Sequence, residues 1–462
     1  AIQAPPRGVA RSGRILEMTP AARIAAAVAL LEQLEAQPRR PADAVSNEFF
    51  RARRYIGGGD RRAVAERAWG VVRERLRLDW HLERVGGQPT PRLLVATHML
   101  MATEESLQSV LATFNGERHA EAPLEPAERR ILSALRPPLL RPEMPEDIRL
   151  NIPGWALPGF RERFGAELPE AAKAMTGAAP LDLRVNLLKA TREAAIATLA
   201  AEGIAAQPTA LSPWGLRLAE RQPILATRAF REGMVEIQDE GSQLIALLAD
   251  ARPGMRVADY CAGAAGKTLA MAAAMDNRGR IVACDVSVPR LSGASQRLRR
   301  AGVDNAETHL LVPGDRWAKR RAGQFDRVLV DAPCTGTGTW RRNPDARLRT
   351  GAGDLAELQV KQGEILRRAA SLVRPGGKLV YATCSVLPGE DEVQVREFLS
   401  DHPEFRAVPL AEAWAQGFAG WEGEAVPVRP GAAMGAGLGG ILGGASGTEL
   451  SLIHISEPTR RR

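Results

Sequence analysis

Residues 255–268 read Met-Arg-Val-Ala-Asp-Tyr-Cys-Ala-Gly-Ala-Ala-Gly-Lys-Thr. An apolar strand ends at Tyr260, a loop of small residues follows, and a helix then runs to about Met275. Small residues let a ligand approach the backbone and the helix N-terminus. Asp285 ends the next predicted strand, 22 residues after Gly263, where an acid can hold both hydroxyls of a ribose. The segment therefore predicts a nucleoside-containing cofactor on a Rossmann-like sheet.

Strands and helices keep alternating after this segment. A second strand is predicted at 281–285, a third ends at 310–313, and two more lie at 327–331 and 378–384. Helices are predicted between and after them, at 290–301, 355–373 and 390–399. Apolar strands that alternate with helices indicate a mostly parallel, doubly wound α/β sheet. Ligands of such sheets bind beyond the carboxyl ends of the strands.

The phosphate loop of nucleoside triphosphatases is the alternative for the same segment. Gly266-Lys267-Thr268 matches the end of that motif, and 327–331 resembles its hydrophobic strand ending in a metal-binding acid. The motif requires a first glycine where this chain has Cys261, so the nucleoside cofactor is favoured. No two cysteines are close enough for a C-x-x-C pair, and we predict no metal site.

Two cysteines follow the ends of neighbouring predicted strands. Asp331-Ala-Pro-Cys334 ends the fourth strand and Thr383-Cys384-Ser385 ends the fifth, so both thiols should lie beside the cofactor loop. Cys284, inside its strand, is interpreted as an inert buried thiol. Two thiols and an acid suit methylation of a pyrimidine at carbon 5. A thiolate adds at carbon 6 to activate carbon 5, an acid acts at N3, and a base later removes the carbon 5 proton. The pyrimidine must also be splayed out of its helix.

These motifs resemble those of the Sun/RsmB family of RNA (cytosine-5)-methyltransferases. The matching segments are 261–268, 325–339 with 341–345, 374–377 and 381–385. Two more, 183–189 and 237–243, are similar to further family segments, and the likeness spans about 181–400.

The resemblance implies S-adenosyl-L-methionine as cofactor and implies roles by position. Cys384 matches the nucleophile, Cys334 the second thiol needed for product release, and Asp331 the acid that contacts the nucleobase and the methyl donor. The remaining matches are cofactor-binding: Cys261, Ala262, Gly263, Ala264, Ala265, Gly266, Lys267, the ribose acid Asp285 and the third acid Asp315. DNA cytosine methyltransferases instead use the cysteine after proline and need a Glu-Asn-Val motif, which we do not find here.

The N-terminal part, residues 14–145, is predicted to be helical and to bind RNA. Residues 1–79 contain fifteen arginines against nine acids, which suits a phosphate backbone. The alternative is that these arginines form solvated helix faces in an arginine-rich chain. Arg54-Tyr-Ile and Asp60-Arg-Arg62 are similar to a NusB-like RNA-binding domain. Asp60 is predicted to cap a helix over 61–82.

Residues 146–235 predict a small α+β linking module, because 181–186 alternates like a strand and 191–202 has helical character. Residues 236–430 are predicted to form the methyltransferase domain. Residues 431–462 are expected to be a low-complexity, non-native tail, since 451–460 resembles translated sequencing-adapter read-through. The family normally closes with a Thr-Asp-Gly-Phe-Phe-type strand, so we expect the sheet to lack its last strand.

Composition excludes several classes of protein. The 462 residues are 45% hydrophobic and 25% charged, which excludes disorder throughout, collagen and disulfide-rich secreted folds. No apolar run reaches about 18 residues, so no transmembrane helix is expected. Residues 21–31 follow a Thr19-Pro20 start and predict an amphipathic helix rather than a signal peptide. Four cysteines without a signal segment predict a cytoplasmic location, and we expect a monomer that binds RNA and no membrane.

The sequence thus predicts an RNA (cytosine-5)-methyltransferase that acts on 16S ribosomal RNA. Transfer RNA is the alternative substrate. A hypothesis from another class is a catalytically impaired RNA-binding assembly factor with an altered C-terminus. Intact Cys384, Cys334 and Asp331 argue against that hypothesis.

Overall fold

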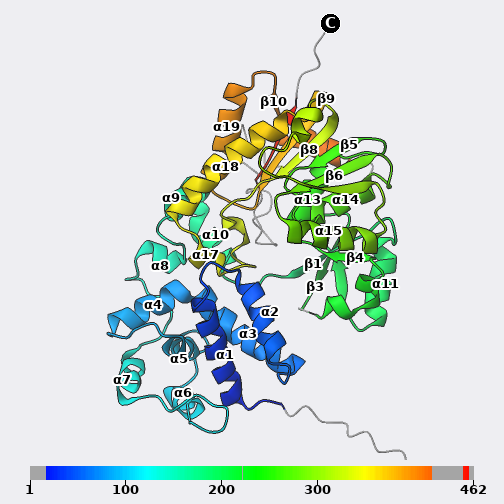
Figure 1. Ribbon diagram of the computed structural model, residues 1–462. Helices are drawn as coiled ribbons and strands as arrows, with labels where there is room; N and C mark the ends of the chain where they lie inside the picture. The colour runs from blue at the N-terminus through cyan, green and yellow to red at the C-terminus, as the bar shows by residue number, and fades with distance from the viewer. Residues whose placement is uncertain (1–16, 221, 419–450, 457–462) are drawn as a thin grey trace, which may run out of the picture. The chain divides into compact units, whose positions relative to one another are not determined.

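The computed structural model describes residues 17–220, 222–418 and 451–456 (Figure 1). The chain forms two compact units, Ala1–Pro153 and Gly154–Arg462, and each is described by itself. The predicted fold classes are confirmed. The first unit is helical, and the second holds a small α+β module and a mostly parallel α/β sheet.

The described part of the first unit consists of eight α-helices, of which α1 to α7 share one apolar core. They are α1 (Pro20–Glu35), α2 (Ala42–Ala52), α3 (Gly58–Arg73), α4 (Arg75–Arg84), α5 (Pro91–Met101), α6 (Leu107–Thr113), α7 (Pro126–Ala134) and α8 (Glu146–Leu150). Thr19 caps α1 by accepting a hydrogen bond from the Ala22 amide at 3.2 Å, and Ile24, Val28 and Leu31 are buried in the core. The predicted helix over this segment is therefore confirmed, and its residues from Ala21 to Leu31 are buried or half-buried. Among the residues that the structure describes, no helix is long and apolar enough to cross a membrane.

Asp60 does not cap its own helix, so that prediction is wrong. It lies inside α3, only 3% exposed, and accepts hydrogen bonds from Arg23 Nε at 2.7 Å and the Met18 amide at 3.2 Å. A buried carboxylate needs such charged partners, and the arginine comes from a distant helix that local spacing does not reveal. The predicted helix over 61–82 is also divided, because α3 ends at Arg73 and α4 begins at Arg75.

The small module of the second unit is a four-stranded antiparallel sheet with helices. After α9 (Leu157–Phe164) and α10 (Leu168–Ala174), the strands are β1 (Leu181–Val185), β2 (Ala206–Pro208), β3 (Gly215–Leu218) and β4 (Val235–Ile237), in the order β2-β3-β1-β4. Helix α11 (Arg192–Ala201) and the short α12 (Arg228–Arg231) complete it, and an apolar core joins strands and helices.

Polar contacts bind this module to the larger sheet domain. Asn186 Nδ2 donates to the carbonyls of Gly233, in the module, and Ala301, in the sheet domain, at 2.9 and 2.8 Å. Glu236 of β4 accepts from Arg297 at 3.1 Å and also from Arg300, both on α15 (Val288–Ala301). Asn186 and Glu236 are both buried, so breaking these contacts would leave buried polar groups unpaired. The contacts therefore stabilise the attachment of the module to the sheet domain.

The larger sheet has seven strands in the order β10-β11-β9-β8-β5-β6-β7. Its parallel strands are β5 (Arg256–Asp259), β6 (Arg280–Asp285), β7 (Ala306–Leu310), β8 (Phe325–Asp331) and β9 (Val373–Thr383). The strand order reverses at β5, which has β6 on one side and β8 on the other. This is the switch point beside which open α/β sheets bind ligands.

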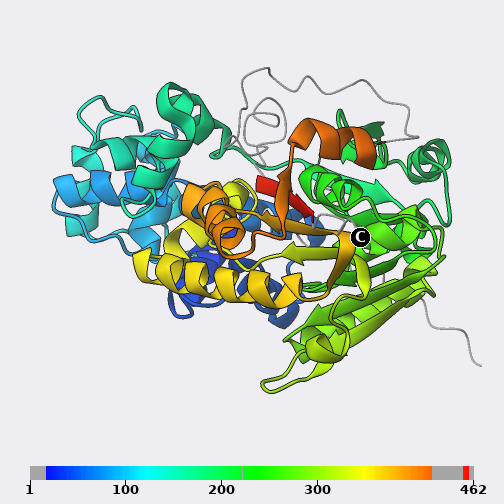
Figure 2. The ribbon, with the colours of Figure 1, turned by 90° about the horizontal axis from the view of Figure 1, so that it is seen from above.

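Helices cover both faces of this sheet (Figure 2). Val257, Ile281 and Leu329 pack on one face, with α13 (Glu240–Leu248), α14 (Gly266–Ala274) and α20 (Leu410–Gly417). Their neighbours in sequence, Ala258 and Val282 among them, pack on the other face, with α18 (Ala352–Ala370) and α19 (Glu392–Asp401). Because successive strand residues point to opposite faces, nearly continuous apolar strands supply two cores at once.

The sheet does not lack its last strand, so that expectation is wrong. β11 (Ser451–Ser456) lies between β9 and β10 (Arg406–Val408) and runs antiparallel to both. It pairs with β9 over six residues, from Ser451 opposite Thr383 to Ser456 opposite Lys378. An edge strand presents unpaired backbone groups, and a short segment rich in leucine and isoleucine satisfies them. The part of the predicted tail at 431–450 and 457–462 lies outside the described residues.

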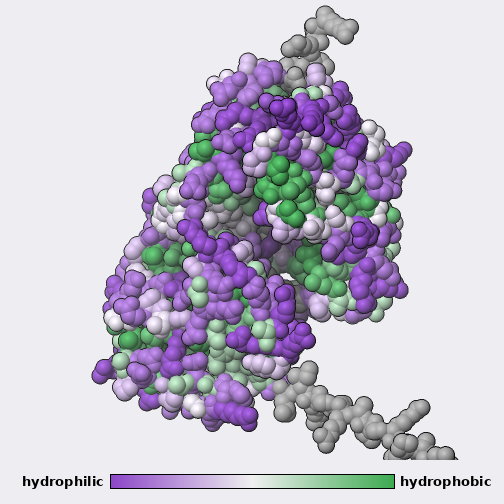
Figure 3. Space-filling model, viewed as in Figure 1, coloured by the Kyte–Doolittle hydropathy of each residue, from purple (hydrophilic) through white to green (hydrophobic). Residues whose placement is uncertain are grey.

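The surface seen in Figure 3 is mainly hydrophilic, with apolar patches of limited size. Among the large apolar side chains that are exposed, Val286 and Val288 follow β6, and Val312 follows β7. These valines are 70%, 57% and 50% exposed. They lie at the carboxyl ends of the strands, where a ligand with an apolar ring would find contact surface.

Candidate active site

The loop between β5 and α14 leaves its backbone open to a ligand. Gly263 and Ala265 both have left-handed conformations, with φ of 55° and 62°, and Ala265 stands at the N-terminus of α14. A side chain at Gly263 would meet no atom within 4 Å, so the space beside the loop is free. The predicted cofactor loop is therefore placed at a helix N-terminus, as the sequence indicated.

Asp285 at the end of β6 is tied to this loop. Its two carboxylate oxygens accept hydrogen bonds from the Gly263 amide at 2.9 Å and the Ser287 amide at 2.8 Å. Each oxygen retains a lone pair for a further donor. Next to it stands the exposed apolar side chain of Val286. A carboxylate that accepts hydroxyl groups beside an apolar surface fits the adenosine part of S-adenosyl-L-methionine.

Asp315 lies after β7 and is held by its own neighbours. It accepts from His309 Nε2 at 2.7 Å and from the Trp317 amide at 2.8 Å. The hydrogen bond with His309, followed by that from Trp317, lowers the pKa of Asp315. Asp315 does not line the pocket described next, so its role as third cofactor acid stays a prediction.

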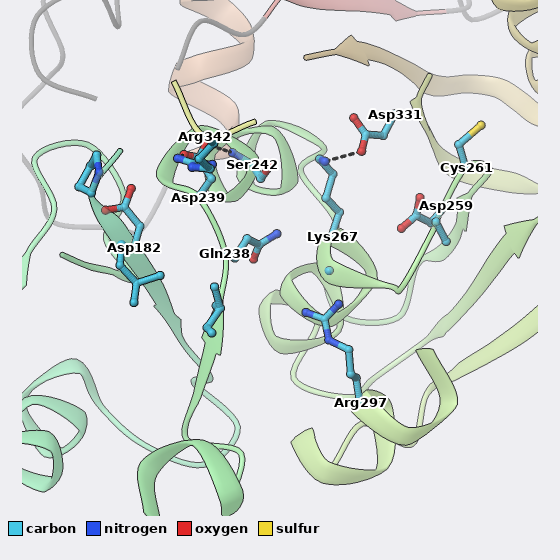
Figure 4. Close-up of a pocket in the computed structure, with 15 residues that line it drawn as sticks. Asp182, Gln238, Asp239, Ser242, Asp259, Cys261, Lys267, Arg297, Asp331 and Arg342 are labelled. Atoms are coloured by element: carbon cyan, nitrogen blue, oxygen red, sulfur yellow. Dashed lines mark hydrogen bonds and ion pairs between the residues drawn. The ribbon is translucent and has the colours of Figure 1, made fainter. Parts of the chain in front are cut away.

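A pocket of about 370 Å³ lies between the cofactor loop and the small module (Figure 4). Residues of the module and its connection form one wall, and residues of the sheet domain form the rest. The lining residues are Pro180, Leu181, Asp182, Ile237, Gln238, Asp239, Ser242, Asp259, Cys261, Ala262, Gly266, Lys267, Arg297, Asp331 and Arg342. Five of the predicted site residues thus share one cavity: Cys261, Ala262, Gly266, Lys267 and Asp331.

Lys267 and Asp331 point toward each other in this pocket (Figure 4). Lys267 Nζ donates to Asp331 Oδ2 at 2.5 Å. Burial lowers the pKa of Lys267, but the charge and hydrogen bond of Asp331 raise it by more, with smaller contributions from Asp259 and Cys384. The pKa of Lys267 therefore lies above its ordinary value. Thr268 Oγ1 donates to Asp259 at 2.6 Å, so both phosphate-loop-like side chains are engaged inside the protein. This arrangement does not favour the nucleoside triphosphatase alternative.

The two predicted thiols are in contact. Cys334 Sγ and Cys384 Sγ lie 3.2 Å apart. They meet because β8 and β9 are parallel neighbours with Asp331 opposite Ala382, so both strands end at the same rim. The hydrogen bond with Cys384 raises the pKa of Cys334, and burial and the charges of Cys384 and Glu390 raise it further. Neither thiol lines the pocket itself.

The other two cysteines, Cys261 and Cys284, lie on the loop after β5 and inside β6. Burial raises the pKa of Cys261 and of Cys284, so both stay protonated near neutral pH. Cys284 is fully buried in β6, in agreement with its interpretation as an inert thiol.

Asp259 carries a stability prediction. Burial raises its pKa to about 6, although Thr268 lowers it, and Asp259 Oδ1 has no hydrogen-bond partner among the described residues. Because the folded-state pKa exceeds that of the unfolded chain, stability is lost as the pH rises from about 4 to about 6. We expect Asp259→Asn to raise the free energy of unfolding by about 1–2 kcal/mol at pH 7.5. Chemical denaturation without cofactor at pH 4 and 7.5 checks this, and a gain of equal size at both values would contradict it.

Sequence reasoning assigned no role to several pocket residues. Asp182 lies on β1, Gln238 and Asp239 follow β4, and Arg342 forms an ion pair with Asp239. Gln238, Asp239 and Arg342 lie in segments that resemble the family, whereas Asp182 does not. The ion pair of Asp239 with Arg342 joins positions 103 residues apart, which local patterns do not reveal. Buried Glu390, which contacts the Cys334 loop, was also missed.

Known proteins are similar to this chain in sequence and in architecture. The model of the 16S rRNA methyltransferase RsmB/F family matches residues 246–437, and that of the RsmF/B-like ferredoxin-like domain matches residues 152–225. Ribosomal RNA small subunit methyltransferase B of Serratia proteamaculans is 31% identical over 369 residues, which cover 76% of this chain and 85% of that protein. The probable ribosomal RNA small subunit methyltransferase B of Synechocystis is 30% identical over 388 residues, 78% and 85% of the two chains.

A solved structure agrees with the fold. The crystal structure of PH0851 has a TM-score of 0.73 and 24% identity, and the match covers 95% of this chain and 99% of that one. At this identity the likeness supports the architecture alone.

Proposed function

The chain belongs to the RsmB/F family of 16S rRNA methyltransferases, and on this premise we propose that it methylates carbon 5 of a cytosine in 16S ribosomal RNA. Membership makes it an RNA methyltransferase that depends on S-adenosyl-L-methionine. The cytosine-5 chemistry, the covalent mechanism and the residue roles are our proposal. The observation that carries it is the pair of touching thiols, Cys334 and Cys384, at strand ends beside the Asp331–Lys267 pair.

Each member of this group has a task in the proposed reaction. Cys384 adds to carbon 6 of the cytosine, which makes carbon 5 nucleophilic. Asp331 acts as the acid: the protonated carboxyl group donates its proton toward N3, where negative charge develops, and the Lys267 ammonium orients the group by its hydrogen bond to Oδ2. S-adenosyl-L-methionine, when bound, supplies the electrophilic methyl group. Cys334 supports the departure of Cys384 after the carbon 5 proton has been removed by a base.

The cofactor is proposed to bind across the carboxyl ends of β5, β6 and β7. The residues proposed to hold it are Cys261, Ala262, Gly263, Ala264, Ala265, Gly266, Lys267, Asp285, Asp315 and Asp331. The open Gly263 backbone and the Asp285 carboxylate beside exposed valines support this placement. We propose residues 236–430 as the catalytic domain and residues 14–145 as the NusB-like RNA-binding domain, linked by the module at 146–235.

Transfer of a tritiated methyl group from the cofactor to RNA tests the function. Unmodified 16S ribosomal RNA and transfer RNA are the two substrates, and the modified nucleoside is identified after digestion. We expect 5-methylcytidine in the ribosomal RNA. Incorporation into transfer RNA alone would change the substrate, another methylated nucleoside would overturn the chemistry, and no incorporation would favour the assembly-factor alternative.

Loss of Asp285 should weaken cofactor binding. We expect Asp285→Ala to cost about 1.5–3 kcal/mol, the range for hydrogen bonds to a charged group. Titration calorimetry with S-adenosyl-L-methionine measures it, and Asp304→Ala, on the exposed loop after α15, is the control of equal charge. Equal affinity in both variants would contradict the ribose role, and tight magnesium-dependent binding of ATP would favour the phosphate-loop alternative.

The arginines of the first unit carry a prediction about RNA binding. Arg51, Arg54 and Arg62 are exposed near the end of α2 and the start of α3. Replacing all three by alanine should lower the slope of log affinity against log salt by roughly 0.7–0.9 for each ion pair with a phosphate that the substitutions remove. The control removes the same charge at other exposed positions: Arg118, Arg130 and Arg136. Equal salt slopes in the two triple variants would favour the interpretation as solvated helix faces.

A further inference from the structure

A buried carboxylate lies beneath the loop that carries Cys334. Glu390 is 0% exposed and accepts hydrogen bonds from the Thr335 amide and from Gln362 Nε2, both at 2.9 Å. The Thr335 hydroxyl donates to its other oxygen. The carboxylate is the acceptor in each of these hydrogen bonds, which is the pattern of the ionised form.

These contacts fix Cys334 from both sides. Gln362 also donates to the Pro333 carbonyl at 2.9 Å, so the residues before and after Cys334 are held by one buried Glu390–Gln362 pair. The Cys384 loop is joined to the same structure, because Thr337 and Ser385 share a hydroxyl contact at 3.0 Å. Buried hydrogen bonds therefore hold both loops whose sulfur atoms lie 3.2 Å apart.

The charges around the two sulfur atoms differ. The Glu390 carboxylate accepts from the amide of Thr335, the residue directly after Cys334, and a negative neighbour disfavours a thiolate at Cys334. On the other side, the Lys267 ammonium interacts electrostatically with Cys384, and its Nζ donates a hydrogen bond to Asp331. Tyr381, on β9, also interacts with Cys334, and its hydroxyl donates to the Glu390 carbonyl at 2.7 Å.

We infer that Glu390 is a positioning residue that makes Cys334 the hydrogen-bond donor and Cys384 the acceptor in the thiol pair. Two chemically identical groups in contact need an asymmetry if only one is to react as the thiolate. Glu390 on one side and Lys267 on the other supply it. The catalytic meaning of this inference rests on the proposed function, but the placement of the proton does not.

Alkylation of Cys334 in Cys384→Ser protein tests the inference. This background leaves one of the two coupled thiols, so its titration belongs to a single site. The full chain is treated with iodoacetamide at a series of pH values, without RNA or cofactor, and the Cys334 peptide is quantified by mass spectrometry. We expect the rate to rise with a midpoint above about 8.5, the value of an ordinary thiol. A midpoint at or below that value would overturn the inference without any change at Glu390.

Two variants of Glu390 in the same background separate charge from packing. Glu390→Gln keeps the shape and removes the charge, and we expect it to lower the midpoint by about one pH unit or more. Glu390→Asp keeps the charge but shortens the side chain and disturbs its hydrogen bonds. The midpoint of Cys334 alkylation should stay above that of an ordinary thiol. Asp391→Asn, which removes the adjacent buried carboxylate, is the matched control and should not move it.

Other outcomes of this series overturn the inference. A purely structural role would make Glu390→Asp the more disruptive change and leave Glu390→Gln like the parent. An equal shift in Asp391→Asn would show that any buried charge suffices. Because the readout is alkylation, a chain that failed to methylate cytosine would still give a clear answer, and the methyl-transfer assay judges the proposed function separately.

Discussion

Cys384→Ala is expected to lower methyl transfer to 16S ribosomal RNA by about 10³-fold or more, since the proposed reaction loses its nucleophile. Affinity for S-adenosyl-L-methionine should change little, because the thiol is proposed to act on the nucleobase. Tritium incorporation and calorimetry measure the two effects on the same protein. The control is Cys284→Ala, which removes a buried thiol outside the site and should keep activity. Comparable turnover in the two variants would remove Cys384 from the mechanism.

Cys334→Ala is expected to trap a covalent protein–RNA complex, which a denaturing gel would show. Addition and methyl transfer require only Cys384 in the proposed scheme, whereas release requires the second thiol. RNA should therefore accumulate in a covalent complex with the protein when cofactor is present, and multiple turnover should nearly cease. The double variant Cys334→Ala, Cys384→Ala should form no complex. Normal turnover without a trapped complex would contradict the release role.

The sequence was sufficient for those parts of the site that depend on local pattern. Strand ends are readable from apolar runs, and parallel strands bring their ends to one rim. The placement of Cys334 and Cys384 at the same rim could therefore be predicted, although their direct contact was seen only in the structure. The cofactor loop and Asp285 follow from spacing within a single strand–helix–strand unit. Both the cysteine pair and the cofactor loop could therefore be placed from patterns within single strands, helices and the loops between them.

What could not be predicted depends on contacts between distant segments. The pocket wall formed by Asp182 and Gln238 comes from a separate sheet, whose placement no local pattern encodes. Glu390 follows the strand of Cys384 but contacts the loop of Cys334, so only the fold shows its partner. The prediction that Asp60 caps its helix was wrong for the same reason, because the rules for helix starts cannot anticipate a partner arginine 37 residues earlier.

The fixed attachment of the small module has a consequence for the kinetics of RNA binding. Within one chain, relative motion of domains is the usual expectation unless their interface is firm. Here Asn186 and Glu236 connect the module to the end of α15, and the two walls of the pocket belong to one compact unit. A nucleobase would enter a cavity that is already assembled, with no hinge to close and less ordering entropy to lose. Association should then be limited by encounter and by extrusion of the nucleobase from its stack, rather than gated by the protein.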